Sequence, residues 1–158
     1  EESPNENLIR FDVSNQEMLV LRQVSNHTVL DFGGNDNAGN TVIGSNAGLF
    51  LATGAGKNVI LGQGAGRDLT TGDFNTFVGR NAGAFSTGQD YNTYLGYHAG
   101  RDNTSGERNV ALGALAGGNS TDGDDNVYIG YNAGELNSGD QNIFKGYEAG
   151  RDETGPNK

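Results

Sequence analysis

The residues best suited to acid–base or metal chemistry are two isolated histidines, His27 and His98, which lie far apart in the chain. The 158-residue sequence has no cysteine, which excludes a disulfide framework and a cysteine-ligated zinc site. The stretch GQGAG around Gly62 is similar to a phosphate-binding loop but lacks the Lys-Ser/Thr pair that such loops use. We therefore predict no catalytic residues, no cofactor and no metal site, and a protein that is not an enzyme.

Charged residues recur at intervals instead of clustering. Arg-Asp pairs begin at Arg67, Arg101 and Arg151, each directly after an Ala-Gly dipeptide, and are explained by surface ion pairs of small energetic value. Acidic residues also recur near a later glycine, and this leaves calcium binding between repeats open. The tighter G-G-x-G-x-D spacing of calcium-binding nonapeptides is missing.

These intervals come from an internal repeat of about 17 residues. Each unit has the pattern N-x-x-x-G-x-x-A-G, and a third glycine follows five or six residues later. The leading residues are Asn40, Asn58, Asn75, Asn92, Asn109, Asn126 and Asn142. Of the 24 glycines from Asn40 onward, 21 occupy these three positions, so the periodicity is not accidental. Self-similarity of this kind predicts a repeat architecture.

Each unit must position its residues on one short strand. The triplet after the asparagine, for example Val59–Leu61 or Thr76–Val78, is rich in β-branched and aromatic residues, which suit a pleated surface. In a strand the first and third residues face one side and the middle residue faces the other. We therefore expect an elongated all-β protein without significant helix.

A unit of this length fits a β-solenoid or β-roll coil of two short strands and two turns, or one strand-and-loop step of a triple β-helix shared between chains. Glycine supplies positive φ and asparagine tolerates left-handed backbone, so the three glycine columns and the asparagines are predicted to form corners. Stacked asparagines would form a ladder, and the alanine column would line a narrow interior. The structural turn residues are Asn58, Asn75, Asn92, Asn109, Asn126, Gly62, Gly79, Gly96, Gly113 and Gly130.

The chain divides into residues 1–39, which do not repeat, and residues 40–158, which hold the seven units. The stretches LIRFDV, EMLVLR and HTVLDF in the first part predict a β-meander that caps the array. In the last unit Lys145 replaces an apolar residue of the triplet, as expected where the array ends.

Aromatic residues occupy two columns of the repeat. The middle of the triplet contains Phe77, Tyr94, Tyr128 and Phe144, which we expect at contacts between the chains of a homotrimer, because a thin rod would otherwise leave them in water. The second column, directly after the first glycine, contains Tyr97, Tyr131 and Tyr147, which are the candidates for stacking on glycan rings. The variable slots Ser45-Asn46, Arg80-Asn81, Tyr97-His98 and Tyr131-Asn132 are predicted to form the outward face.

The segments NTVIGSNAG, NTFVGRNAG, NTYLGYHAG and NVYIGYNAG, each followed by a turn such as TTG or STG, resemble the shaft repeats of bacteriophage tail fibres that stand upstream of endosialidase-type chaperone domains. A more distant resemblance is to the heads of trimeric autotransporter adhesins. Both resemblances imply a parallel homotrimer, on a virion or at a cell surface, that attaches to a host glycan or receptor.

Composition excludes other partners. The net charge of −10 and the lack of a basic stripe argue against nucleic acid, and no apolar run is long enough for membrane insertion. The sequence thus predicts a structural shaft or adhesin segment, with a glycan-binding module as the alternative and an ice-binding protein as a weaker one. Ice binding would use the Thr or Ser before the third glycine, a column that Asp122 interrupts.

Overall fold

The computed structural model describes residues 9–13, 16–24, 27–31, 39–52 and 54–153, which form an all-β fold without a helix. The described part accordingly contains no helix long and apolar enough to cross a membrane. The first three strands are β1 (Ile9–Val13), β2 (Gln16–Val24) and β3 (His27–Asp31), which pair antiparallel in that order. The predicted β-meander is confirmed. Its role as a cap stays a prediction, because residues 32–38 lie outside the described residues.

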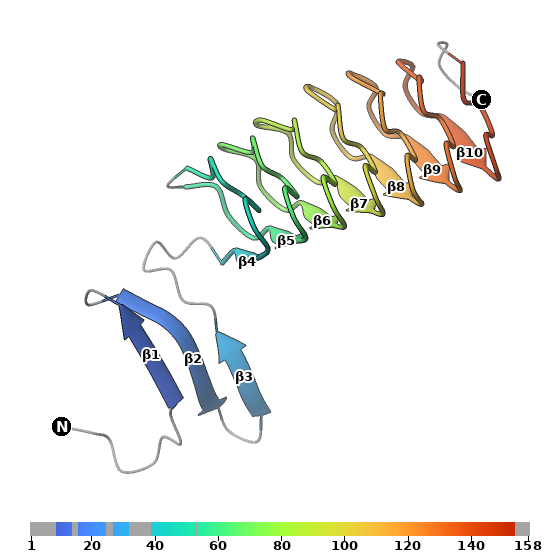
Figure 1. The fold of residues 1–158 in the computed structure, drawn as a ribbon. Coiled ribbons are helices and arrows are strands. Elements are labelled where there is room, and N and C mark those ends of the chain that lie inside the picture. The colour runs from blue at the N-terminus through green and yellow to red at the C-terminus, as the bar shows by residue number, and fades with distance from the viewer. Residues whose placement is uncertain (1–8, 14–15, 25–26, 32–38, 53, 154–158) are drawn as a thin grey trace.

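Each of the seven units contributes one strand to a single parallel sheet (Figure 1). The strands are β4 (Thr41–Ile43), β5 (Val59–Leu61), β6 (Thr76–Val78), β7 (Thr93–Leu95), β8 (Val110–Leu112), β9 (Val127–Ile129) and β10 (Ile143–Lys145). They lie in chain order and in strict register, so that Thr76 pairs with Thr93 and Thr93 with Val110. At about 4.8 Å per step, the sheet extends about 29 Å along the solenoid axis.

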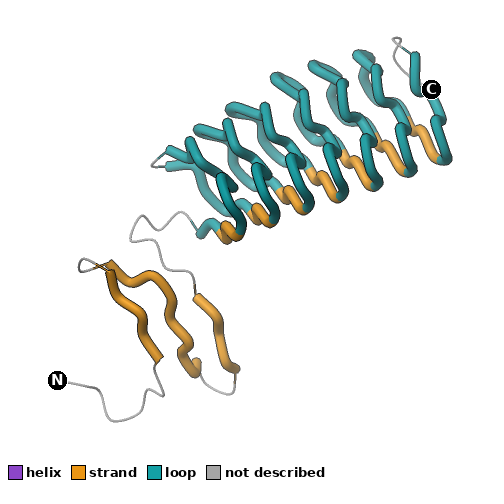
Figure 2. The backbone as a smooth tube through the Cα atoms, in the orientation of Figure 1, coloured by secondary structure: helices purple, strands orange, loops and turns teal. Residues whose placement is uncertain are grey.

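The other described residues of each unit form turns and loops that stack on the neighbouring coil (Figure 2). Backbone hydrogen bonds join the loops: the Gly66 N–H donates to the Ala82 carbonyl at 2.9 Å, and the Gly83 N–H to the Ala99 carbonyl at 3.0 Å. The structure combines the two coil designs that the sequence left open: it is a β-solenoid, as in the first, but has one strand and a loop per unit, as in the second. A single chain builds the whole β-solenoid.

The solenoid interior is filled by the middle residue of each triplet and by the alanine column. The buried side chains are Ile60, Phe77, Tyr94, Ala111, Tyr128 and Phe144 from the triplets, and Ala65, Ala82, Ala99, Ala116 and Ala133 from the column. The rings stack between coils, with centroids 5.1 Å apart for Phe77 and Tyr94 and 6.1 Å apart for Tyr128 and Phe144. Burial of these rings is a large part of the hydrophobic stabilisation of the array.

This packing corrects the role expected for the four central rings. The sequence reasoning placed Phe77, Tyr94, Tyr128 and Phe144 against other chains, yet within one chain they are 0%, 1%, 2% and 7% exposed. Alanine and glycine on the opposite wall leave room for one ring at each level. A side chain at Gly83, for example, would come within 2.8 Å of the Phe77 ring. The rings therefore form the core of the single chain, with almost no surface left for a partner.

The glycine columns have two different causes. The first and second columns have positive φ, as predicted; Gly96 has a φ of 145° and Gly100 a φ of 55°. Gly106, in the third column, is not left-handed, but a Cβ there would collide with the Gly123 carbonyl of the next coil. At Gly72, Gly106 and Gly123 the third column is therefore defined by close approach of two backbones. In the third unit Gln89 occupies this place, whereas the sequence pattern had assigned it to the preceding glycine.

Candidate functional site

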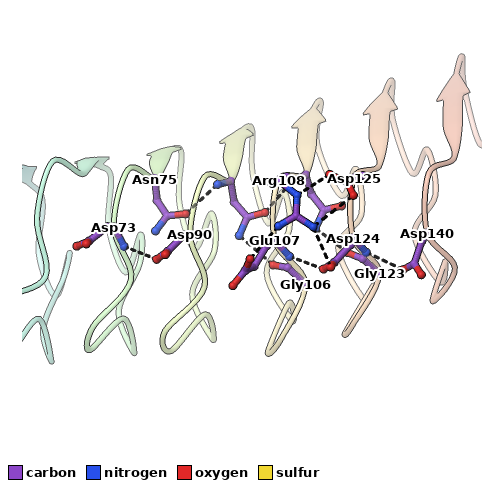
Figure 3. A network of polar contacts seen from close by, with 12 residues as sticks. Asp73, Asn75, Asp90, Gly106, Glu107, Arg108, Gly123, Asp124, Asp125 and Asp140 are labelled. Carbon is purple, nitrogen blue, oxygen red and sulfur yellow. Dashed lines mark hydrogen bonds and ion pairs between the residues drawn. The ribbon is translucent and has the colours of Figure 1, made fainter.

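A ladder of buried asparagines joins all seven units, as the sequence predicts. At each step the backbone N–H of a leading asparagine donates to the side-chain Oδ1 of the asparagine one unit earlier. The bond from Asn75 to Asn58 measures 2.8 Å and that from Asn92 to Asn75 measures 2.9 Å. The same bond is made by Asn58, Asn109, Asn126 and Asn142 at 2.9–3.0 Å. Figure 3 shows the central steps of the ladder, which is almost completely buried.

The asparagine side-chain amides also close each coil on itself. The Asn75 Nδ2 donates to the Gln89 carbonyl at 2.7 Å, and the Asn109 Nδ2 donates to the Gly123 carbonyl at 2.7 Å. An exception occurs in the 16-residue unit, where the Asn126 Nδ2 finds no acceptor among the described residues. These bonds give the asparagine column a structural role and leave no exposed surface on it for a ligand.

A second ladder, of carboxylates, links coils in the opposite direction in two runs, one from Gly56 to Asp90 and one from Glu107 to Asp140 (Figure 3). The Asp73 N–H donates to the Asp90 Oδ1 at 2.7 Å, the Glu107 N–H to the Asp124 Oδ1 at 2.8 Å, and the Asp124 N–H to the Asp140 Oδ1 at 2.9 Å. Here the acceptor belongs to the following unit, and the side chains are partly or fully exposed. The acidic residues thus have backbone partners, and among the described residues no group of three or more His, Cys, Asp or Glu is placed to hold a metal ion.

Exposed ion pairs lie beside the carboxylate ladder. The Arg108 guanidinium is 2.9 Å from Glu107, 3.1 Å from Asp124 and 2.6 Å from Asp125, and its hydrogen bond lowers the pKa of the Asp125 carboxyl. The predicted pair of Arg101 with Asp102 is present as well, at 2.5 Å. Such exposed ion pairs contribute little to the stability of the protein, so they are features of the surface and do not hold the fold together.

Two of the core tyrosines carry polar contacts that the sequence reasoning missed. The Asn103 Nδ2 donates to the Tyr94 hydroxyl at 2.5 Å, and the Ser120 Oγ lies 3.4 Å from the Tyr128 hydroxyl. Burial raises the pKa of Tyr94 above its ordinary value, and it raises the pKa of Tyr128 to about 12. The signal in the sequence is the residue three positions after the second glycine, which is small or polar in most units and points inward.

His98 is held in a surface position without a catalytic partner. Its ring stacks on Tyr97 with centroids 3.9 Å apart, and its two nitrogens lie 3.1 Å from the Asn81 Nδ2 and 3.2 Å from an Arg101 guanidinium nitrogen. Partial burial, together with the charges of Arg101 and Arg80, lowers the pKa of His98. An amide, cationic groups and a phenol ring are neither nucleophile nor base near neutral pH, so this arrangement does not point to acid–base catalysis.

The three candidate glycan-stacking tyrosines are all on the surface. Tyr97, Tyr131 and Tyr147 are 45%, 46% and 74% exposed. Tyr131 and Tyr147 stack with centroids 5.6 Å apart and planes 12° from parallel. Tyr97 is separated from this pair by the coil that carries Ala114 in the same column. The column therefore presents one pair of stacked tyrosines and one tyrosine, Tyr97, that stacks on His98 instead.

A second exposed aromatic pair was not recognised from the sequence. Phe74 and Tyr91 stack with centroids 5.0 Å apart and planes 3° from parallel, and the Lys57 Nζ lies 4.6 Å from the centre of the Phe74 ring. Each of these residues directly precedes a leading asparagine, and each has a positive φ near 60°. The signal in the sequence for this pair was that both aromatic residues occupy the same position of the repeat, directly before the leading asparagine.

The variable slots are only partly outward-facing. The first residue of each slot, including Ser45 and Arg80, is exposed as predicted. Asn132, however, is only 8% exposed. In the slots after the first, the second residue adopts left-handed backbone and hydrogen-bonds the preceding coil; the Asn132 N–H, for example, donates to the Ala114 carbonyl at 3.1 Å. This bond draws the backbone of the second residue toward the stack.

No family model matches this chain, and searches among curated proteins and among solved structures return no match. The fold and the geometry of its surfaces are therefore the features that bear on function.

Proposed function

We propose that this chain is a non-enzymatic shaft or adhesin segment of an elongated surface appendage, such as a phage tail fibre. In this proposal it works on a virion or at a cell surface, as a homotrimer that attaches to a host glycan or receptor. The supporting observation is that the same backbone bonds and the same asparagine contacts recur at every coil. A catalytic site needs unlike groups at one place, whereas this array distributes like groups along an axis.

The contacts between coils favour a stiff spacer. Every step combines a parallel strand pair, a buried asparagine bond and loop-to-loop backbone bonds. In repeat proteins the stability comes from such nearest-neighbour contacts, so length is added without a new core. Repetition on linked chains also converts weak individual contacts into firm multivalent attachment.

Deletion of two whole units tests the spacer role. Removing residues 75–108 joins one complete unit to another, and the rod should shorten by about 10 Å while it keeps its β circular dichroism. Small-angle X-ray scattering on the full chain and on the deletion variant measures this change. An unfolded variant, or an unchanged maximum dimension, would contradict the proposal.

A second candidate function, glycan binding, is favoured by the stacked and exposed pair of Tyr131 and Tyr147. Flat aromatic faces at the surface are suited to stacking on sugar rings. Replacing Tyr97, Tyr131 and Tyr147 together by Ala should abolish binding on a glycan array. The matched control replaces the other exposed pair, Phe74 and Tyr91, by Ala. Equal binding by both variants and the wild type would eliminate this column as the glycan site.

A further inference from the structure

The outer face of the seven-stranded sheet is an apolar surface without a partner in the single chain. It consists of the first and third residues of each triplet, which point away from the buried middle residue. We call it the aliphatic face. Its residues are Thr41, Val59, Thr76, Thr93, Val110, Val127 and Ile143 in one row, and Ile43, Leu61, Val78, Leu95, Leu112, Ile129 and Lys145 in the other. Ile43 and Leu95 are each 49% exposed and Ile143 is 66% exposed.

The aliphatic face is bordered by most of the other exposed apolar residues of the array. The column just before the leading asparagine contributes Phe74 and Tyr91, and the column just after the first glycine contributes Tyr97, Tyr131 and Tyr147. Together the face and its borders contain nine of the thirteen large hydrophobic residues recorded as exposed in the described part of the chain. Exposed apolar residues gathered along one side of an array in this way mark an interaction site.

The charge distribution is compatible with contact between two copies. Although the chain has a net charge of −10, the two rows carry no charged residue until Lys145 in the last strand. The carboxylate ladder and the Arg-Asp pairs lie outside the two rows. Two copies can therefore bring their aliphatic faces together without placing like charges opposite each other along most of the sheet.

The regular spacing indicates which partner fits. All seven strands are in register, so the face repeats the same two-row profile at every strand step. A partner with a non-repeating surface matches one coil and mismatches the others. A partner that matches the whole length must repeat with the same step, and the array of another copy of this chain does so.

We propose that the neighbouring copies of this chain in the homotrimer pack on the aliphatic face, with the bordering tyrosines and phenylalanine at the edge of the contact. This inference rests on the proposed homo-oligomeric shaft and specifies its interface. It moves the contact between chains from the middle residues of the triplets, which form the core, to the first and third residues.

A pair of matched substitutions tests this assignment in the full chain. Leu95→Glu places a charge at the centre of the aliphatic face, on a residue that is 49% exposed. Leu136→Glu places the same charge on a loop residue outside the face that is 44% exposed. Both positions accept charge within the fold, since Lys145 occupies the row of Leu95, and Asp68 and Asp102 occupy the column of Leu136.

Light scattering and sedimentation give the result. The wild type and Leu136→Glu should be oligomers at micromolar concentration. Leu95→Glu should associate on the order of 100-fold more weakly, because an unpaired charge is buried in the contact. Circular dichroism should be the same for all three proteins.

A monomeric wild type, or unchanged association of Leu95→Glu, would overturn the proposal. A monomeric wild type that shows thermal hysteresis, which Leu95→Glu loses, would assign the face to ice instead. The length change on deletion of residues 75–108 is measured on whatever assembly forms. The spacer function and the interface can therefore fail separately.

Discussion

The two polar ladders make the same kind of bond in opposite surroundings. In both, a side-chain oxygen accepts a backbone N–H from an adjacent coil. The buried ladder contains Asn in every unit, whereas the exposed ladder varies among Asp, Glu and, at its first position, Gly56. Water can replace a lost partner at the surface but not in the interior, where an unsatisfied polar group is costly. Invariance in this repeat therefore marks the places where no other group can supply the bond.

The largest effect is expected from breaking the buried ladder at Asn75. Asn75→Ala removes the acceptor for the Asn92 N–H and the donor to the Gln89 carbonyl, in a region that excludes water. Two such losses should reduce the free energy of unfolding by about 3 kcal/mol. Urea unfolding followed by circular dichroism measures this value. A loss below about 1 kcal/mol would show that the ladder is not what holds the coils together.

A smaller loss of stability is expected when the turn whose carbonyl accepts the hydrogen bond from a buried asparagine amide is displaced. Gly106→Ala introduces a Cβ that collides with the Gly123 carbonyl, the acceptor for Asn109, and should cost about 2 kcal/mol through overpacking. Gly88→Ala is the control, because its Cβ meets only the Thr71 hydroxyl, at 3.0 Å, and its φ is not positive. Thermal unfolding of both variants compares them. If both variants lose the same stability, Gly88 is as closely packed as Gly106. That result would contradict the assignment of Gln89, in place of Gly88, to the position of close backbone approach.

Alkaline pH extends the comparison to the buried phenols. Tyr94 and Tyr128 have raised pKa values in the folded state, against an ordinary value of about 10. Their contribution to stability is therefore complete below pH 10 and is lost as the pH rises toward the folded-state values. At pH 11 the loss should be about 1 kcal/mol for each ring. Urea unfolding at pH 8 and pH 11 measures it, and Tyr94→Phe should show a smaller difference between the two pH values than the wild type does.

The smallest effect is expected in the exposed ladder. Asp90→Ala removes the acceptor for the Asp73 N–H, which water can then bind, so the loss should stay below about 1 kcal/mol. The comparison with Asn75→Ala is direct, because both residues belong to the same unit. If the two variants lost similar amounts of unfolding free energy, the buried and exposed ladders would not differ in their contribution to stability.

Much of this architecture was predictable because periodicity translates directly into stacked geometry. The asparagine ladder, the strand triplets and the inward alanines all follow from residues that recur at one spacing. Where the aromatic rings in the middle of the triplets pack was not predictable in this way. Alternation places Phe77 opposite Thr76 and Val78, but it does not say whether the far side faces the chain's own loop or another chain. That outcome depends on the width of the coil, which the alanine and second-glycine columns set.

Single departures from the repeat were also beyond sequence reasoning. Gln89 takes the place assigned to Gly88 because the close backbone approach, and not the residue type, defines the position. The inward turn of Asn132 likewise depends on a backbone bond to the preceding coil. Of the candidate surfaces, the tyrosine column was found from its spacing. The aliphatic face was not predictable, because alternation places the first and third residues of a triplet on one side of the strand without saying whether that side faces the interior.

The opposite directions of the two ladders have a consequence for how the chain folds as it is synthesised. When Asn75 has joined the stack, its Oδ1 is the acceptor that the N–H of the still unmade Asn92 will need. The Asp73 N–H, in turn, receives its partner only when Asp90 has been made. Each finished coil therefore templates the buried bond of the coil that follows it, and later coils complete the surface bonds of Gly56, Asp73, Glu107 and Asp124 in the coils before them. Such an array can be laid down one coil at a time, in the order in which the ribosome delivers its residues.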